Sequence, residues 1–99
     1  MIIAINKLSL ANQILEKYPE NQKQSPLYKK VLKSIKEIGI INPLLVVQEK
    51  DQYKVVYGNN RYLAGLELGY KEFEIAVLPD ALPKTIMDKA KEYQSINLD

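Results

Sequence analysis

A strand-like segment that leads through one glycine into a helix-like segment is the feature that most constrains this chain. Residues 53–57, which read YKVVY, alternate as a half-buried strand does, and residues 59–68 have the spacing of a short helix that ends at Gly69. Gly58 alone separates the two segments. Because a strand and a helix follow each other directly, the sequence predicts a mixed α/β fold.

Turn and capping residues divide the rest of the chain into further elements. Pro19 ends one short apolar helix whose cap is Ser9, and Ser25 with Pro26 starts a longer helix that Gly39 ends. Two apolar runs form a hairpin across residues 50–51. The expected order is strand (1–5), helix (8–17), polar loop (19–24), helix (26–38), strand (44–47), strand (53–57), helix (59–68), strand (73–79) and helix (about 83–95).

Length and composition limit the classes of protein that this chain can belong to. Its 99 residues are enough for one hydrophobic core, so we expect a single domain over residues 1–99. The sequence contains no cysteine and no histidine, which excludes disulfides, thiol catalysis, histidine acid–base chemistry and the usual zinc sites. No metal site is expected. The sequence has no segment typical of a membrane span, and we expect a cytoplasmic protein.

The junction after residue 57 also suggests a chemical role. The first turn of a helix has backbone N–H groups without internal partners, and the helix dipole favours an anion there. Gly58 permits close approach of a ligand, Arg61 offers a planar cation suited to phosphate oxygens, and Asn59 or Asn60 can cap the helix or bind the ligand. The alternative is a plain turn with a helix cap and a surface arginine. Neither a Walker loop nor a dinucleotide-binding fingerprint is present.

A row of lysines marks the predicted helix at residues 26–38. Its members are Lys29, Lys30, Lys33 and Lys36. A solvated helix face is one interpretation. The other is contact with the DNA backbone, for which Lys29, Lys33 and Lys36 are the candidates.

Two motifs in succession resemble the ParB/sulfiredoxin superfamily, and in particular the ParB-like amino-terminal domain, also described as ParB-like nuclease. They read SIKEIGIINPLLV and YKVVYGNNRYLAGLELGYKEFEIAVL, and the resemblance covers about residues 33–78. It implies a compact single-domain α/β (α+β) fold, with a small mixed sheet flanked by helices. It further implies a nucleotide (CTP, ATP or ADP, with or without magnesium) as ligand. The implied phosphate-binding residues are Gly58, Asn59, Asn60 and Arg61, supported by Asn42, Pro43 and Tyr62.

The sequence departs from this family at Asn59. Partition proteins have a glutamate there that is associated with nucleotide hydrolysis, and sulfiredoxins have their reactive cysteine there. An asparagine cannot act as a general base, so the resemblance implies binding without hydrolysis by that route, and sulfinic-acid reduction is excluded. No catalytic residue is assigned. A phosphotransferase or nuclease would need a carboxylate near the phosphates, for which the candidates are Glu37, Asp51 and Glu67.

The sequence therefore predicts a stand-alone nucleotide-binding domain with a DNA-associated partition or regulatory role. Two alternatives stay open: an enzyme of the same fold, and a phage or plasmid interaction module that has lost nucleotide binding. The expected partners are a nucleotide, DNA, and a protein partner or a second copy of the chain, which could dimerise through the last helix.

Overall fold

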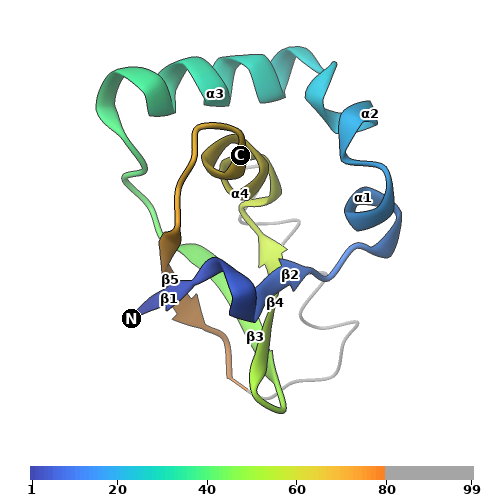
Figure 1. Cartoon of the computed structure of the whole chain (residues 1–99), viewed down its shortest axis with the longest axis vertical. Helices are drawn as coiled ribbons and strands as arrows, with labels where there is room; N and C mark the ends of the chain where they lie inside the picture. Colours follow the sequence, from blue (N-terminus) through green and yellow to red (C-terminus); the bar gives the residue numbers. More distant parts are fainter. Residues whose placement is uncertain (80–99) are drawn as a thin grey trace.

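The computed structural model describes residues 1–79, and the helix expected at about 83–95 lies outside this range. The described part contains a five-stranded mixed sheet and four α-helices (Figure 1). The elements are β1 (Ile2–Ala4), a 3₁₀ turn η1 (Ile5–Lys7), β2 (Leu8–Leu10), α1 (Gln13–Lys17), α2 (Pro19–Lys23), α3 (Pro26–Ile38), β3 (Leu44–Glu49), β4 (Gln52–Tyr57), α4 (Asn59–Glu67) and β5 (Glu72–Val77).

The sheet is strongly curled. Its strand order is β1-β5-β3-β4-β2, so β1 and β2 lie at opposite edges although only the three residues of η1 connect them. Such a connection spans at most about 14 Å, so the two edges must approach each other. The β3–β4 pair is an antiparallel hairpin, whereas β5 runs parallel to β3 and β2 runs parallel to β4.

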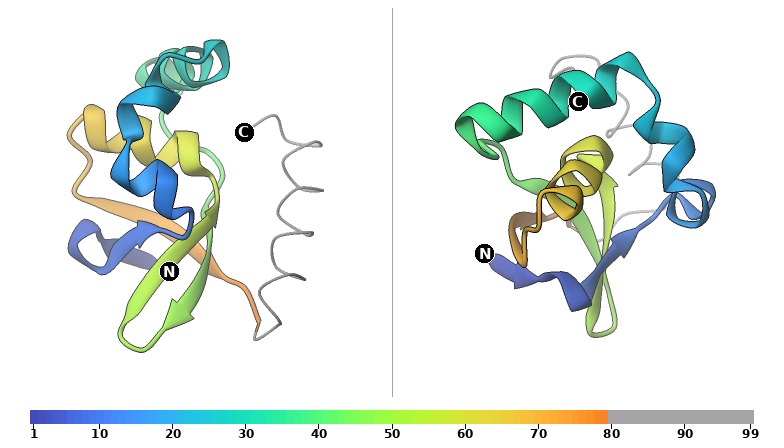
Figure 2. Two further views of the ribbon diagram at one scale, coloured as in Figure 1. Left: turned by 90° about the vertical axis from the view of Figure 1, so that its right-hand side faces the viewer. Right: turned by 45° about the horizontal axis from the view of Figure 1, so that its top comes forward.

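Helix α4 lies between the sheet and α3, as the two views of Figure 2 show. Its contact with the sheet is close, because a Cβ added at Gly65 would lie 2.5 Å from Cε1 of Phe73 on β5. The core forms where these layers meet. Its largest fully buried side chains come from α3, β3 and β4, and they are Tyr28, Leu44, Val46, Val55 and Tyr57. The core therefore fixes α4, and with it the β4–α4 junction, in the middle of the molecule.

Most predicted elements are confirmed. The Ser25 hydroxyl accepts a hydrogen bond from the Tyr28 backbone N–H, and Pro26 is the first residue of α3. Gly39 ends that helix with a φ of 79°. The hairpin turns at residues 50–51, and α4 begins directly after Gly58. No helix within residues 1–79 has both the length and the apolar content that crossing a bilayer requires.

Two predictions in the amino-terminal part are wrong. Residues 8–10 form strand β2 and not a helix, because Leu8 and Leu10 both point into the core while β2 pairs with β4. The helix starts only at residue 13, and its cap is Asn12 instead of Ser9.

The segment expected as a polar loop contains helix α2. Pro19 is its first residue, a position that suits proline because the missing N–H has no helical partner there. The helix has no buried residue, so its sequence lacks the apolar spacing that would have predicted a helix.

Candidate functional site

The β4–α4 junction is built around Gly58. This residue has a φ of 98°, in the left-handed region that only glycine adopts readily, and it is the N-cap of α4. A Cβ at this position would lie 2.8 Å from Cδ2 of the fully buried Leu44. No side chain caps the helix, so neither Asn59 nor Asn60 has the capping role that the sequence allowed. The first turn is left open to an incoming acceptor.

Arg61, the single arginine of the sequence, connects α4 to the loop between α3 and β3. Its Nη1 donates hydrogen bonds to the backbone carbonyls of Asn42, at 2.8 Å, and of Pro43, at 2.9 Å. The guanidinium carbon lies 5.1 Å from the centre of the Tyr57 ring, which is a cation–π geometry. The side chain is only 7% exposed. Its charge is therefore held in one place next to the open helix turn.

The two asparagines of the junction have different surroundings. The Asn60 side chain is buried, and its Oδ1 accepts a hydrogen bond of 2.8 Å from Nε2 of Gln22 on α2. Asn59 is half-buried, and its Oδ1 is buried without a hydrogen-bond partner in the described part of the chain. A buried oxygen without a partner is costly, so Asn59 is the residue here that gains most from a bound donor.

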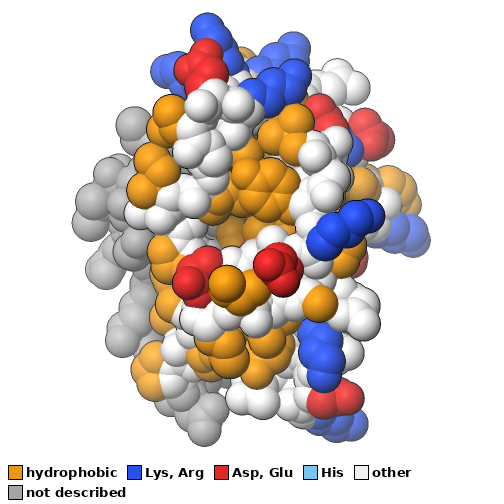
Figure 3. All heavy atoms as spheres, turned by 60° about the vertical axis from the view of Figure 1, so that its left-hand side comes forward, with side chains coloured by type: hydrophobic (Ala, Val, Ile, Leu, Met, Phe, Trp, Pro, Cys, Tyr) orange, Lys and Arg blue, Asp and Glu red, His pale blue; other side chains and the backbone are white. Residues whose placement is uncertain are grey.

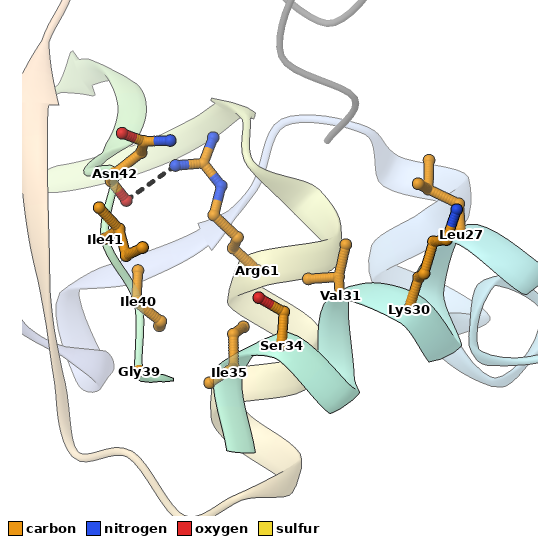
Figure 4. A pocket seen from close by; sticks show the side chains of 10 residues that line it. All are labelled: Leu27, Lys30, Val31, Ser34, Ile35, Gly39, Ile40, Ile41, Asn42 and Arg61. Atoms are coloured by element: carbon orange, nitrogen blue, oxygen red, sulfur yellow. Dashed lines mark hydrogen bonds between the residues drawn. The ribbon is translucent and has the colours of Figure 1, made fainter. Parts of the chain in front are cut away.

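A pocket of about 370 Å³ lies beside Arg61, between α3 and the loop that leads to β3 (Figure 4). One wall comes from α3 and the other from residues 39–42, and Arg61 closes the end that faces α4. Its polar members are Lys30, Ser34, Asn42 and Arg61; its other lining residues are Leu27, Val31, Ile35, Gly39, Ile40 and Ile41. The pocket thus combines apolar walls with two cations, as expected for a ligand that is both flat and anionic.

Of the residues predicted from the sequence, the pocket brings together only Asn42 and Arg61. Gly58 and Asn59 lie at the N-terminal end of α4. The Arg61 guanidinium is close to them, because a Cβ added at Gly58 would lie 3.2 Å from the Arg61 Nη2. Pro43 contributes its carbonyl to Arg61. The sequence did not indicate the α3 wall of the pocket, because apolar residues at helical spacing are expected to face the core. Leu27 shows the difference, since it is 37% exposed and lines the pocket.

Tyr62 supports the site from the interior. Its ring packs against Phe73 with centroids 5.4 Å apart, and its hydroxyl donates a hydrogen bond of 3.3 Å to the Leu8 carbonyl. Burial, together with the charge of Glu16, raises the pKa of Tyr62 above its usual value. The side chain is therefore a neutral part of the core that holds α4 against β2.

Two of the three candidate carboxylates, Glu67 and Asp51, lie far from the start of α4. Glu67 is the last residue of α4, about 12 Å along the helix axis from Asn59, and its Oε1 accepts a hydrogen bond of 2.8 Å from the Tyr28 hydroxyl. Asp51 lies in the hairpin turn, about 23 Å along β4 from Gly58. Glu37 is exposed near the end of α3. No group of acidic side chains in residues 1–79 could hold a metal ion.

The predicted lysines are all exposed on α3. Figure 3 shows basic side chains, with an acidic one among them, gathered at the upper end of the molecule where α3 lies, above a hollowed and more hydrophobic region. Lys29, Lys33 and Lys36 lie apart from the pocket, whereas Lys30 lines it.

Comparison with known proteins agrees with the fold. The sequence profile of the ParB N-terminal domain matches residues 5–92. No curated protein sequence matches the chain.

Among solved structures, the chain is similar to the chromosome-partitioning protein ParB from Caulobacter crescentus, truncated at its C-terminus and complexed with CTP-gamma-S. The TM-score is 0.74 at 20% identity, over 95% of this chain and 51% of that one. It is also similar to a Pnob8-like ParB-N domain, with a TM-score of 0.67 at 24% identity over 98% of this chain and 36% of that one. This chain thus spans about half, or less, of these two relatives.

A third similar structure is sulfiredoxin from Arabidopsis thaliana, with a TM-score of 0.60 at 20% identity over 100% of this chain and 98% of that one. The curled sheet, the position of α4 inside it and the match over residues 5–92 agree with one another. The chain belongs to the ParB N-terminal domain family.

Proposed function

We propose that this chain is a nucleotide-binding domain in which the phosphates lie at the start of α4 and the nucleoside lies in the pocket beside α3. The observation that carries the proposal is the position of Arg61. Its guanidinium lies next to Gly58 at the open helix turn and also forms the end wall of the pocket. One ligand with an anionic part and a flat part would occupy both places.

The start of α4 suits phosphate oxygens for three reasons. Its first-turn N–H groups have no side-chain cap, the helix dipole is positive at this end, and Gly58 leaves space where a side chain would be. Asn59 adds a side-chain amide whose Nδ2 can donate a hydrogen bond to a phosphate oxygen. Asn60 has a supporting role in this proposal, because Gln22 already occupies its oxygen.

The pocket suits the nucleoside. Its volume of about 370 Å³ falls within the usual range for small-molecule sites, and Leu27, Val31 and Ile41 offer apolar surface for a base. Ser34 and Asn42 supply polar groups at the same walls. CTP is the first nucleotide to test, because the similar Caulobacter ParB was solved with a CTP analogue. ATP and ADP are the alternatives.

We infer that binding does not lead to hydrolysis. An asparagine at position 59 cannot take a proton from water. Glu67 lies about 12 Å from this residue along α4, and Asp51 lies about 23 Å from Gly58 along β4. The same distances argue against a phosphotransferase or a nuclease centred on Arg61. Magnesium does not fit an all-protein site here, so any magnesium would depend on the phosphates for its ligands.

A thermal-shift screen tests this proposal. CTP, ATP, ADP and GTP are added with and without magnesium to the wild type and to Ser34→Tyr, which fills the pocket and leaves residue 61 an arginine. Lys33→Tyr is the matched control, because it places the same ring about 100° away around α3, at an exposed position outside the pocket.

At 100 times its dissociation constant, a nucleotide should stabilise the wild type by about 2.7 kcal/mol, and raise the melting temperature by about 10–20 °C. The same rise is expected in the control and a much smaller one in Ser34→Tyr. If no nucleotide raises the melting temperature of the wild type, the domain has lost nucleotide binding and an interaction module becomes the better explanation.

A further inference from the structure

Three lysines on α3 form a row that faces solvent. We call Lys29, Lys33 and Lys36 the lysine row; all three are exposed. At 3.6 residues per turn they fall within about 60° of arc, over about 10 Å of helix axis. The buried residues Tyr28 and Ile35 are turned about 110° or more from the centre of the row. The row is thus a flat, rigid edge on a helix that the core holds in place.

The charges of the row are not neutralised by their surroundings. Within residues 1–79, the ion pairs involve the chain's amino terminus and Lys23, and none involves a member of the row. Glu37 is the one acidic residue on α3. The net charge of the whole chain is only +2, so this local excess of positive charge is a property of the helix rather than of the composition.

The row is separate from the pocket. Leu27, Val31 and Ser34, which line the pocket, are turned about 130° or more from the centre of the row. A partner on the row would not fill the nucleotide pocket, and a mutation in one surface can leave the other intact.

We propose that the lysine row is a docking surface for the phosphate backbone of double-stranded DNA, without sequence preference. Each strand of a duplex presents one phosphate per 3.4 Å of axis, so the 10 Å of the row can follow about three successive phosphates. The helix fixes the spacing of the three backbone positions, and the flexible lysine side chains let each ammonium group reach a phosphate. Lysine supplies point charges and no base-reading geometry, so the contact is to the backbone alone.

The row fits DNA better than an anionic membrane. Binding to a bilayer surface requires apolar side chains that enter the headgroup region beside the basic ones. On α3, Leu32 is half-buried and packs against the core. The exposed apolar residues Leu27 and Ile38 are turned about 150° and 170° from the centre of the row.

Fluorescence anisotropy with a labelled 24-base-pair duplex tests this inference. Affinity is measured at several salt concentrations, for two unrelated DNA sequences, in the wild type and in the triple variant Lys29→Gln, Lys33→Gln and Lys36→Gln. The control has the same change of net charge at exposed lysines outside α3: Lys7→Gln, Lys50→Gln and Lys71→Gln. Circular dichroism of each variant establishes that it is folded.

Three phosphate contacts predict a slope of about −2.7 for log Kobs against log salt, or an affinity loss of about 40-fold between 50 and 200 mM. The row variant should bind at least about tenfold more weakly at 50 mM and lose most of that slope, while the control keeps both. Equal loss in the two triple variants would overturn the inference, and so would wild-type binding to anionic vesicles but not to DNA. Because neither variant alters the pocket, nucleotide binding can fail or succeed independently of this result.

Discussion

Truncation of Arg61 to alanine should destabilise the domain before any ligand is considered. The substitution removes two hydrogen bonds from a charged donor to the carbonyls of Asn42 and Pro43. Bonds of this kind contribute about 1.5–3 kcal/mol each when the acceptor is buried. Asn42 is exposed, so water can replace the lost donor there, whereas Pro43 is half-buried. The contact with the Tyr57 ring adds about 0.5–1 kcal/mol.

Together these losses predict a decrease of about 2–4 kcal/mol in the free energy of unfolding. A domain of this size has about 5–15 kcal/mol in total, so the variant should still fold. A loss of 3 kcal/mol lowers the melting temperature of a domain of up to about 100 residues by about 12–24 °C. The loop between α3 and β3 should lose its attachment to α4, because Arg61 is what holds it there.

Urea denaturation followed by circular dichroism measures this loss. Arg61→Lys is the informative comparison, because it keeps the charge but not the planar fork, and should fall between the wild type and alanine. Lys71→Ala truncates an exposed cation and should change stability by less than about 0.5 kcal/mol. The reasoning is refuted if Arg61→Ala has the same denaturation midpoint as Lys71→Ala. It also follows that nucleotide effects in Arg61 variants must be compared with each variant's own melting temperature.

Two further predictions concern the junction and the core. Gly58→Ala should cost about 1–3 kcal/mol, because alanine resists a φ of 98° and its methyl group would meet a buried leucine; a denaturation midpoint equal to the wild type would contradict this. Burial, with the hydrogen bond to Glu67, raises the pKa of Tyr28 above its usual 10.0, so its contribution to stability is complete below pH 10 and is lost as the pH rises further. Urea denaturation at pH 9 and pH 11 should show a smaller decline in Tyr28→Phe than in the wild type, and equal declines would show that Tyr28 does not titrate in this way.

Capping and turn residues in the sequence predicted where several helices and strands begin and end. Ser25, Pro26 and Gly39 set the ends of α3 through a cap, a first-turn proline and a left-handed glycine, and the structure confirms all three. The resemblance to the ParB/sulfiredoxin superfamily likewise predicted the fold that the structure has. These features depend on residues close together in the sequence or on motifs known from relatives.

Features that depend on distant contacts could not be predicted in this way. Leu8 and Leu10 fit a helical stripe with Ile14 as well as they fit a strand, and the choice is made by the pairing of residues 8–10 with β4, more than 40 residues later. Helix α2 has no apolar stripe at all, and it contacts the rest of the molecule through Gln22 and Lys23. The spacing of apolar residues near these two segments indicates neither the pairing of β2 with β4 nor the contacts of α2.

The candidate site likewise contains residues that the sequence could identify and residues that it could not. Gly58 and Arg61 were identifiable from the junction, because a turn glycine and an arginine in a first helical turn have a recognisable spacing. The apolar residues that line the pocket between positions 27 and 41 could not be identified from the sequence. The spacing of apolar residues on a helix does not distinguish a face that packs in the core from one that lines a pocket. Likewise the carbonyl contacts of Arg61 depend on how the loop before β3 folds back.

The most direct test of the central claim is an NMR titration of the ¹⁵N-labelled domain with CTP. We predict that the backbone amide signals of residues 58–61 shift together with those of residues 39–42 and the pocket side of α3, while those of the β3–β4 hairpin turn do not. The backbone amide signal of Asn59 should shift strongly, because its N–H lies in the uncapped first turn of α4 and would donate to a phosphate oxygen. Saturable shifts confined to another surface, or no shifts at millimolar CTP, ATP and ADP, would contradict the claim that the start of α4 binds nucleotide phosphates.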